Sequence, residues 1–273
     1  MSKYSYLHSI IDNNISKLTT RQIIDLIVEN YSIESKSGLR RYTDKRKLKY
    51  KTKLIKTTSE TLDNVLIIPD LHLPFKLSGY LTFAKETYKK FDCTKVVFIG
   101  DLIDNCASSY HELNPNGMSA SLELDTAIEQ LQEWYEAFPI ATVINGNHDI
   151  LPNRKVKTSG LDKRWIKQHK DVLGTPDWEF VDELIHNNIL YTHGHVTKEA
   201  YQECLYRQMP VVSGHRHTHC YIRYQTKKLW GMQTGIAFNK NVYAFDYSKG
   251  NIGQQVEAIA LVLGNVPVLI PYN

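Results

Sequence analysis

The chain has 273 residues and a formal net charge of +4, and 42% of its residues are hydrophobic and 23% charged. This composition is that of an ordinary soluble globular protein and excludes a disordered or fibrous chain. No apolar stretch reaches the ~18 residues of a membrane helix and the N-terminus has no signal-peptide core, so we expect no membrane partner. Four cysteines without CxxC spacing exclude a disulfide framework and a zinc knuckle, and we expect a cytoplasmic location.

The first 60 residues differ in character from the rest and predict a small helical extension. Thr19, with Gln22 three residues later, forms a capping-box pattern at the start of a helix. Apolar residues then recur at helical spacing, at Ile23, Ile24, Ile27, Val28 and Tyr31. We therefore expect residues 1–60 to form one unit and residues 61–273 another.

A strongly basic run follows the predicted helix. Residues 35–56 hold ten basic residues and one acid, a net charge of +9, so the rest of the chain carries −5. Two interpretations stay open: a solvated charged helix or linker, and a helix-turn-helix-like element that binds nucleic acid. We expect nucleic acid as a partner through residues 36–56, although nothing in the run selects a groove or a base.

From about Leu62 onward, short apolar runs alternate with helical segments, which predicts an α/β fold with parallel strands and covering helices. Helices are expected at 79–91, 120–137 and 198–208. The tail, residues 219–247 and 255–270, is rich in β-forming residues with glycine punctuation and predicts antiparallel strands of a second sheet. The expected strands are Val65–Ile68, Val96–Ile99, Ala141–Ile144, Ile189–Tyr191 and Val211–Val212.

Each of these five strands is followed by a short polar segment, where ligands gather in open α/β sheets. Seven of the eleven histidines lie in or next to these segments. Clustered histidines are costly as packing but natural around metal ions. The segments are Asp70-Leu71-His72, Gly100-Asp101-Leu102-Ile103-Asp104-Asn105, Gly146-Asn147-His148-Asp149, His193-Gly194-His195 and Gly214-His215-Arg216-His217.

In this order the five segments resemble the calcineurin-like metallophosphoesterase superfamily, over about residues 62–270. The resemblance implies a four-layer α/β/β/α sandwich as the catalytic domain, with the helical N-terminal extension outside it. It also implies a hydrolase in which a hydroxide that bridges two metals attacks phosphorus in line.

The resemblance implies two sets of ligands that share one carboxylate. Asp101 would bridge both metals, as a shared carboxylate holds two cations ~3.5–4 Å apart. Oxygen and imidazole donors without thiolate favour Mn²⁺, Fe, Zn²⁺ or Ni²⁺, and family habit favours Mn²⁺. The first metal would be held by Asp70, His72 and His217, and the second by Asn147, His193 and His215.

By the same resemblance His148 is the catalytic residue that donates to the leaving oxygen or stabilises the transition state. Asp104 would orient His148, as a carboxylate commonly orients an imidazole; the alternative for Asp104 is a turn residue. Asp149 is expected to support the loop.

Substrate contacts are expected at Asn105 and Arg216. Asn105 stands where protein serine/threonine phosphatases carry an arginine, and Asp149 where they carry a glutamate; both departures disfavour that branch. Basic residues after the third segment either line a pocket rim that attracts phosphates or are plain solvated surface: Arg154, Lys155, Lys157, Lys163 and Arg164.

Three functions compete. The favoured one is a nucleic-acid phosphodiesterase of nuclease or DNA-repair type, in which the basic run binds the phosphate backbone. The second is a phosphomonoesterase, or a small-molecule or cyclic-nucleotide phosphodiesterase, in which the basic run is incidental. The third is a non-catalytic module that binds DNA or protein, which the intact set of candidate ligands disfavours.

Overall fold

The structure is a computed structural model. It describes residues 7, 10–11, 14, 18–31, 36–44, 62–110, 114–197, 199–245 and 255–272. Residues 45–56, most of the predicted nucleic-acid-binding run, lie outside this part of the chain. The chain divides into two compact units, Met1–Thr61 and Leu62–Asn273.

The N-terminal unit is a small helical unit with an apolar core. Helix α2 (Thr20–Asn30) begins at the capping box that the sequence predicts: Gln22 N donates to Thr19 Oγ1 at 3.2 Å, and Thr19 N donates to Gln22 Oε1 at 2.9 Å. Residues 36–44 form a second helix that buries Leu39 and Thr43. The core consists of Leu7, Ile11, Ile23, Ile24, Ile27 and Leu39.

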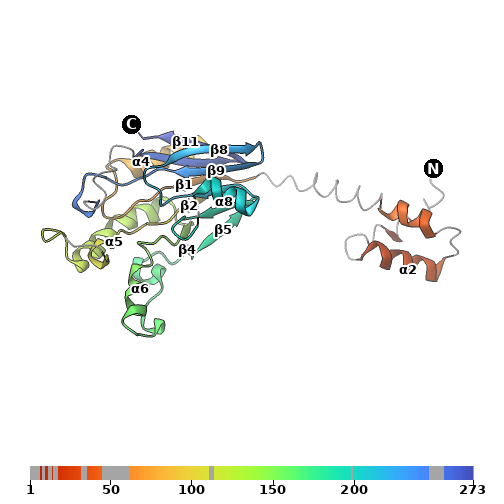
Figure 1. The fold of residues 1–273 in the computed structure, drawn as a ribbon, viewed down its shortest axis with the longest axis horizontal. Helices are drawn as coiled ribbons and strands as arrows, with labels where there is room; N and C mark the ends of the chain where they lie inside the picture. Colours follow the sequence, from red (N-terminus) through yellow and green to blue (C-terminus); the bar gives the residue numbers. More distant parts are fainter. Residues whose placement is uncertain are drawn as a thin grey trace. The chain divides into compact units, whose positions relative to one another are not determined.

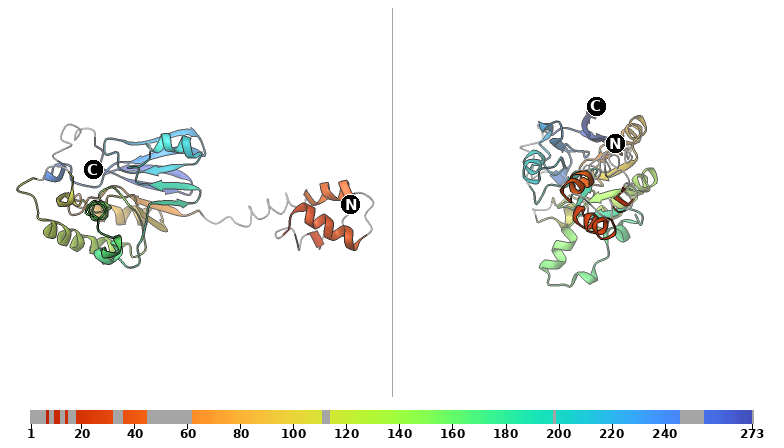
Figure 2. Two further views of the ribbon diagram at one scale, coloured as in Figure 1. Left: turned by 60° about the horizontal axis from the view of Figure 1, so that its bottom comes forward. Right: turned by 90° about the vertical axis from the view of Figure 1, so that its right-hand side faces the viewer.

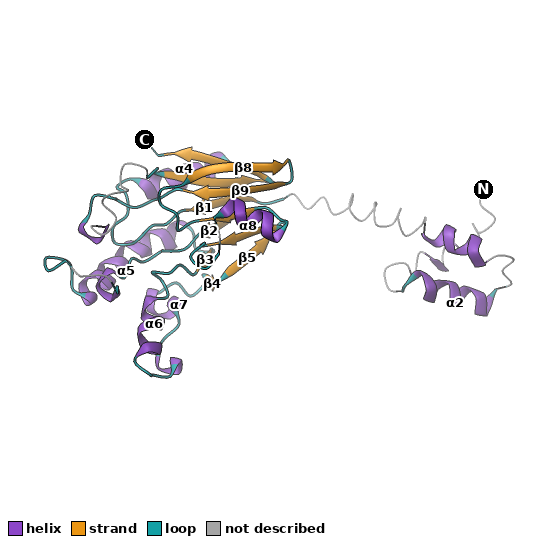
Figure 3. Cartoon of the chain, viewed as in Figure 1, coloured by secondary structure: helices purple, strands orange, loops and turns teal. Residues whose placement is uncertain are grey.

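Two sheets form the centre of the second unit (Figures 1 and 3). The six-stranded sheet has the order β11-β10-β1-β2-β3-β4, with β1 to β4 parallel and β10 antiparallel to β1. Its strands are β1 (Asn64–Ile68), β2 (Lys95–Phe98), β3 (Thr142–Ile144), β4 (Glu179–Val181), β10 (Ala258–Leu263) and β11 (Val266–Pro271).

The second sheet has five strands in the order β5-β6-β7-β9-β8. Strands β6, β7 and β9 are parallel, and β5 and β8 pair antiparallel at the two edges. The strands are β5 (Glu183–His186), β6 (Ile189–Thr192), β7 (Val211–Ser213), β8 (Cys220–Thr226) and β9 (Leu229–Thr234).

Alternation along β1 shows how the layers are built. Val65 and Ile67 face the core between the two sheets, together with Trp230 and Met232 of the second sheet. Leu66 and Ile68 face the opposite core, which helices α4 (Tyr80–Lys90) and α5 (Ala120–Ala137) cover. Helix α8 (Ala200–Arg207) packs on the second sheet through Ala200 and Cys204. The expected four-layer α/β/β/α sandwich is therefore confirmed.

The predicted tail is wrong in one respect. Strands β8 and β9 belong to the second sheet as expected, but β10 and β11 extend the first sheet through β1. Strand β10 reads AIALVL and is buried almost throughout, so it needs a partner on each edge and apolar cover on both faces. Residues 235–245 form no named strand, because the chain turns at Gly235 (φ +80°) and runs as a loop.

The shorter helices lie in the loops that follow β2 and β3. They are α6 (Leu151–Thr158), α7 (His169–Leu173) and two 3₁₀ turns, η2 (Cys106–Ser108) and η3 (Lys163–Trp165). No helix among the described residues is both long and apolar enough to cross a membrane.

Candidate metal centre

Polar residues that follow five strands meet at one place. Asp70 follows β1, Asp101 follows β2, Asn147 follows β3, His193 follows β6, and His215 and His217 follow β7. The turns are tight: His72, Asp101 and His215 adopt positive φ angles of 47°, 49° and 68°. Gly146 and Gly214 leave no room for a side chain, because a Cβ on Gly146 would collide with Asp101 and one on Gly214 with Asp70.

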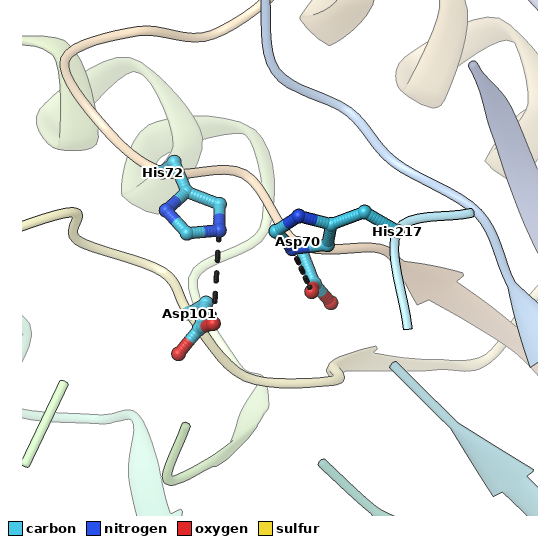
Figure 4. A group of neighbouring side chains, drawn as sticks. All are labelled: Asp70, His72, Asp101 and His217. Carbon is cyan, nitrogen blue, oxygen red and sulfur yellow. Dashed lines mark hydrogen bonds and ion pairs between the residues drawn. The ribbon is translucent and has the colours of Figure 1, made fainter. Parts of the chain in front are cut away.

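One group of possible metal ligands combines Asp70, His72, Asp101 and His217 (Figure 4). Their nearest ligand atoms all lie within 4.8 Å of one another. Asp70 Oδ2 is 3.0 Å from His217 Nε2, and His72 Nε2 is 3.6 Å from Asp101 Oδ2. The structure thus brings together the three residues expected at the first metal and the expected bridging carboxylate.

A second group combines Asp101, His193 and His215. His193 Nε2 lies 3.1 Å from Asp101 Oδ2 and 3.1 Å from the amide oxygen of Asn147. The residues expected at the second metal therefore also lie side by side. Asp101 belongs to both groups, which is the position that a bridging ligand requires.

The donor atoms fit divalent cations. Asp70 Oδ1 and His72 Nε2 are buried and have no hydrogen-bond partner among the described residues. A buried polar atom without a partner costs about 1–3 kcal/mol, and bound cations would offset this cost. The other ring nitrogens are anchored, since His72 Nδ1 donates to Asp104 Oδ1 at 2.6 Å and His193 Nδ1 to Ile99 O at 3.1 Å. This leaves each Nε2 directed to the cluster, as in metal-binding histidines generally.

Charge inside the cluster is balanced between carboxylates and imidazoles. Burial by itself would raise the pKa of Asp101, but His193 and His148 outweigh it and hold this pKa well below its usual value. Burial lowers the pKa of His193, whereas Asp101 and Asp70 raise it, with a net rise to about 9. Burial, with the neighbouring His193, lowers the pKa of His215 to about 4. Asp101 is therefore ionised at neutral pH, as a metal ligand must be.

His148 and Asp104 lie beside the first group, but their contact differs from the expected one. His148 Nδ1 donates to the main-chain oxygen of Asp104 at 2.6 Å, while the Asp104 carboxylate is 3.4 Å away. The short contact of that carboxylate is with His72, because the two side chains point into the same buried space. Burial raises the pKa of Asp104 to about 7 although His148 opposes the rise. Asp104 thus holds His148 through its backbone and His72 through its side chain.

The two expected substrate contacts lie at the edge of the cluster. The Asn105 amide donates to His148 O at 3.1 Å, so this side chain fixes the loop that bears His148. Arg216 is exposed between His215 and His217. Asp149 supports the loop as expected, since it accepts from Gly146 N at 2.8 Å and from Ile103 N at 3.1 Å.

Several supporting residues of the centre carry no signal in the sequence. Phe238 and Phe245 stack on each other at 4.1 Å, and both rings pack against His72. Glu123 of α5 accepts from Cys106 N and Ala107 N at 2.6 and 2.9 Å, and so fixes the turn that follows Asn105. No local sequence pattern marks either contact.

The geometry agrees with comparisons of the sequence with known families. The sequence model for calcineurin-like phosphoesterases matches residues 64–247, about two thirds of the chain. The chain belongs to this family. It is therefore a metal-dependent phosphoesterase, a hydrolase of phosphate esters, and its cluster provides ligands for divalent metal ions.

Several solved structures are similar to this chain, and two of them serve as examples. A phosphoesterase from E. coli (Yfce) is 13% identical with a TM-score of 0.39, over 73% of this chain and 87% of its own. Vacuolar protein sorting 29 from Cryptosporidium parvum is 12% identical with a TM-score of 0.39, over 77% of this chain and 96% of its own. No curated protein sequence matches this chain.

Proposed function

We propose that this phosphoesterase is a two-metal phosphodiesterase that acts on nucleic acid, as nucleases and DNA-repair enzymes do. The observation that carries the proposal is the charged face of the N-terminal unit. In the helix of residues 36–44, Leu39 and Thr43 are buried, whereas Lys36, Arg40 and Arg41 are exposed. Exposed Lys and Arg side chains bind the phosphate backbone of nucleic acids independently of the base sequence.

In this proposal the cluster holds two divalent ions, with Mn²⁺ as our first candidate. One ion would be held by Asp70, His72 and His217, and the other by Asn147, His193 and His215. Asp101 would be a ligand of both. When bound, the pair of ions activates water and neutralises charge on the phosphoryl oxygens. The protein contributes a rigid frame, because the ligands follow strands of two packed sheets.

His148 is placed to act on the leaving group. Its Nδ1 is engaged by Asp104 O, so Nε2 is the ring nitrogen that remains for substrate. The side chain is 15% exposed, which admits a substrate oxygen while the ring stays fixed. A proton held at Nε2 passes to the departing ester oxygen as the bond to phosphorus breaks.

The charges around the cluster favour a diester over a monoester. Within residues 62–110, 114–197 and 199–245, no Lys or Arg forms an ion pair with a cluster residue. A terminal phosphate carries an extra negative charge, which enzymes commonly bind with a bidentate guanidinium. Phosphomonoesters and small cyclic diesters stay as the alternative substrates.

The test compares substrates and matched charge variants of the full chain. Manganese-loaded protein is assayed on bis(p-nitrophenyl) phosphate, p-nitrophenyl phosphate, and single- and double-stranded DNA. We expect the diester to be cleaved faster than the monoester. The K36E/R40E/R41E variant should bind DNA more weakly and cleave it more slowly than wild type but keep turnover of the small diester. The control K227E/K228E, on the exposed turn between β8 and β9, should behave as wild type. Equal DNA cleavage by both variants would remove the support for nucleic acid.

We also propose a cytoplasmic location. The four cysteines, all among the described residues, are free thiols. Burial raises the pKa of Cys93, Cys204 and Cys220 to about 11 and that of Cys106 to about 12, so none is a reactive thiolate.

A further inference from the structure

A basic arm, defined here as residues 151–170, follows the His148 segment directly. It contains α6 and η3 and protrudes from the body of the two sheets (Figures 1 and 2). The arm holds seven basic residues and one acid, a charge of +6 in 20 residues, whereas the whole chain carries +4. Such a concentration beside a phosphoesterase centre attracts polyanions.

Cations of the arm are available to a ligand. The one acid, Asp162, is paired with Arg164 at 3.0 Å. Lys157 and Lys167 are exposed and have no ion pair among the described residues. At the near end of the arm, Lys155 is ordered by Tyr110: its Nζ lies 4.0 Å from the ring centroid and donates to Ser109 O at 3.3 Å.

Trp165 is the most exposed large apolar side chain of the described residues, at 83%. Its neighbour in the arm, Leu161, is 56% exposed. The three other tryptophans, Trp134, Trp178 and Trp230, are almost completely buried. An exposed indole in a segment that also carries lysines without ion pairs has the composition of a stacking platform for unpaired bases.

Two hollows lie along the arm, and one of them reaches two residues next to the centre, Asn105 and Asp149. The larger, about 630 Å³, is lined by Lys157, Leu161, Ile166 and Lys167. The smaller, about 140 Å³, is lined by Asn105, Asp149 and His169, whose buried Nε2 has no partner among the described residues. Asn153, Ile166 and Lys167 line both hollows, so the two adjoin. The smaller one is close in size to a cavity of ~150 Å³ that holds a single aromatic ring.

We propose that the basic arm is the strand-binding surface of the catalytic unit, where single-stranded nucleic acid stacks a base on Trp165 and places phosphates on Lys157 and Lys167. The inference rests on the proposed nucleic-acid substrate. A single strand is favoured over a duplex because stacking on an exposed indole requires an unpaired base. It is favoured over an acidic protein because an acidic protein has no base to stack on the exposed indole of Trp165.

Fluorescence of Trp165 gives a direct readout, because the other three indoles are shielded from a surface ligand. Full-length protein in EDTA, which prevents hydrolysis, is titrated with a single-stranded oligonucleotide, the matching duplex and poly-glutamate. We expect strong quenching by the single strand only. Trp165→Ala should weaken binding about 5- to 150-fold. K157Q/K167Q should lower the slope of log affinity against log salt by about 1.4, while K227Q/K228Q leaves it unchanged.

The outcomes separate this inference from the proposed function. Quenching by poly-glutamate or duplex equal to that by the single strand overturns the inference, as does wild-type single-strand affinity in Trp165→Ala. If wild-type protein binds the strand through Trp165 but the metal-loaded enzyme cleaves no nucleic acid, the role of the arm in binding single strands is supported and the proposed function fails. If the arm variants cleave DNA at the wild-type rate, the proposed function stands and the arm is excluded.

Discussion

The carboxylate of Asp104 lies 2.6 Å from Nδ1 of His72, deep in the protein. Because Nδ1 donates to this carboxylate, the lone pair of His72 is fixed on Nε2, the atom directed to the metal cluster. The position of the Asp104 carboxylate therefore controls how well His72 binds a metal ion.

Asp104→Ala should weaken metal binding about 10- to 100-fold, the usual effect of removing such a support. Asp104→Asn should lose less, since its amide oxygen still accepts from Nδ1. Metal affinity is measured by competition with a chromophoric chelator. At saturating metal, turnover should fall less than in His148→Ala, because the main-chain oxygen that holds His148 remains. If Asp104→Ala instead had normal metal affinity and a turnover as low as that of His148→Ala, the Asp104 carboxylate would act by orienting His148 and not by supporting His72.

His148→Ala should retain both metals and slow turnover about 10²- to 10⁴-fold, the usual contribution of a positioned acid or base. The His148 ring is hydrogen-bonded to the main-chain oxygen of Asp104 and is not one of the expected metal ligands. Metal content measured by elemental analysis should therefore not change. The loss should be largest for nucleic acid, whose leaving alkoxide needs a proton, and smaller for the p-nitrophenolate ester. An equal loss on both substrates would place His148 in transition-state charge stabilisation instead of proton donation.

Acid stability should depend on Asp63, at the entry to β1. Thr94 Oγ1 donates to Asp63 Oδ1 at 2.6 Å, and His186 Nε2 lies 2.8 Å from Oδ2. The hydrogen bond from Thr94, with a smaller contribution from His186 and against the effect of burial, lowers the pKa of Asp63. A lowered pKa stabilises the fold above the unfolded-state value of ~3.9, and this stability is lost as the pH falls through the folded-state pKa.

Asp63→Asn should therefore lower the free energy of unfolding at pH 7, by less than about 1 kcal/mol because the pair is partly exposed. The difference from wild type should close on acidification below about pH 3.9. Denaturant titrations at several pH values measure it. Thr94→Val is the matched variant: it should raise the pKa of Asp63 in carboxyl NMR titrations. A constant difference across the acid range would show that the carboxylate contributes through packing alone.

The local part of this structure could be predicted from the sequence. Each apolar run became a strand and each polar segment fell at its end, because both features depend on neighbouring residues. The ligand sets came with the family resemblance, and the structure brings the same residues together. What failed depends on distant contacts: the pattern of β10 predicts a strand, but its pairing with β1 joins positions almost 200 residues apart.

The supporting residues illustrate the same limit. The GDxxD spacing places Asp104 near the site. His72 and His148 both lie close to its carboxylate, and only the fold shows that the hydrogen bond is made with His72. Phe238 reaches His72 because the loop that starts at Gly235 runs over the site. No sequence pattern in that loop indicates that its side chains pack against a metal ligand.

Metal binding should stabilise the folded chain, since Asp70 Oδ1 and His72 Nε2 are buried without partners among the described residues. Free Mn²⁺ at 100 times its dissociation constant should add about 2.7 kcal/mol to the free energy of unfolding, or roughly 5–10 °C in Tm. EDTA should reverse the gain, as followed by scanning calorimetry. Asp101→Asn should abolish most of it together with turnover, because this carboxylate serves both groups of ligands. The control K227Q/K228Q should be stabilised by Mn²⁺ as much as wild type. If Mn²⁺ stabilised Asp101→Asn equally, the ions would bind elsewhere, and the assignment of Asp101 as the shared ligand would be wrong.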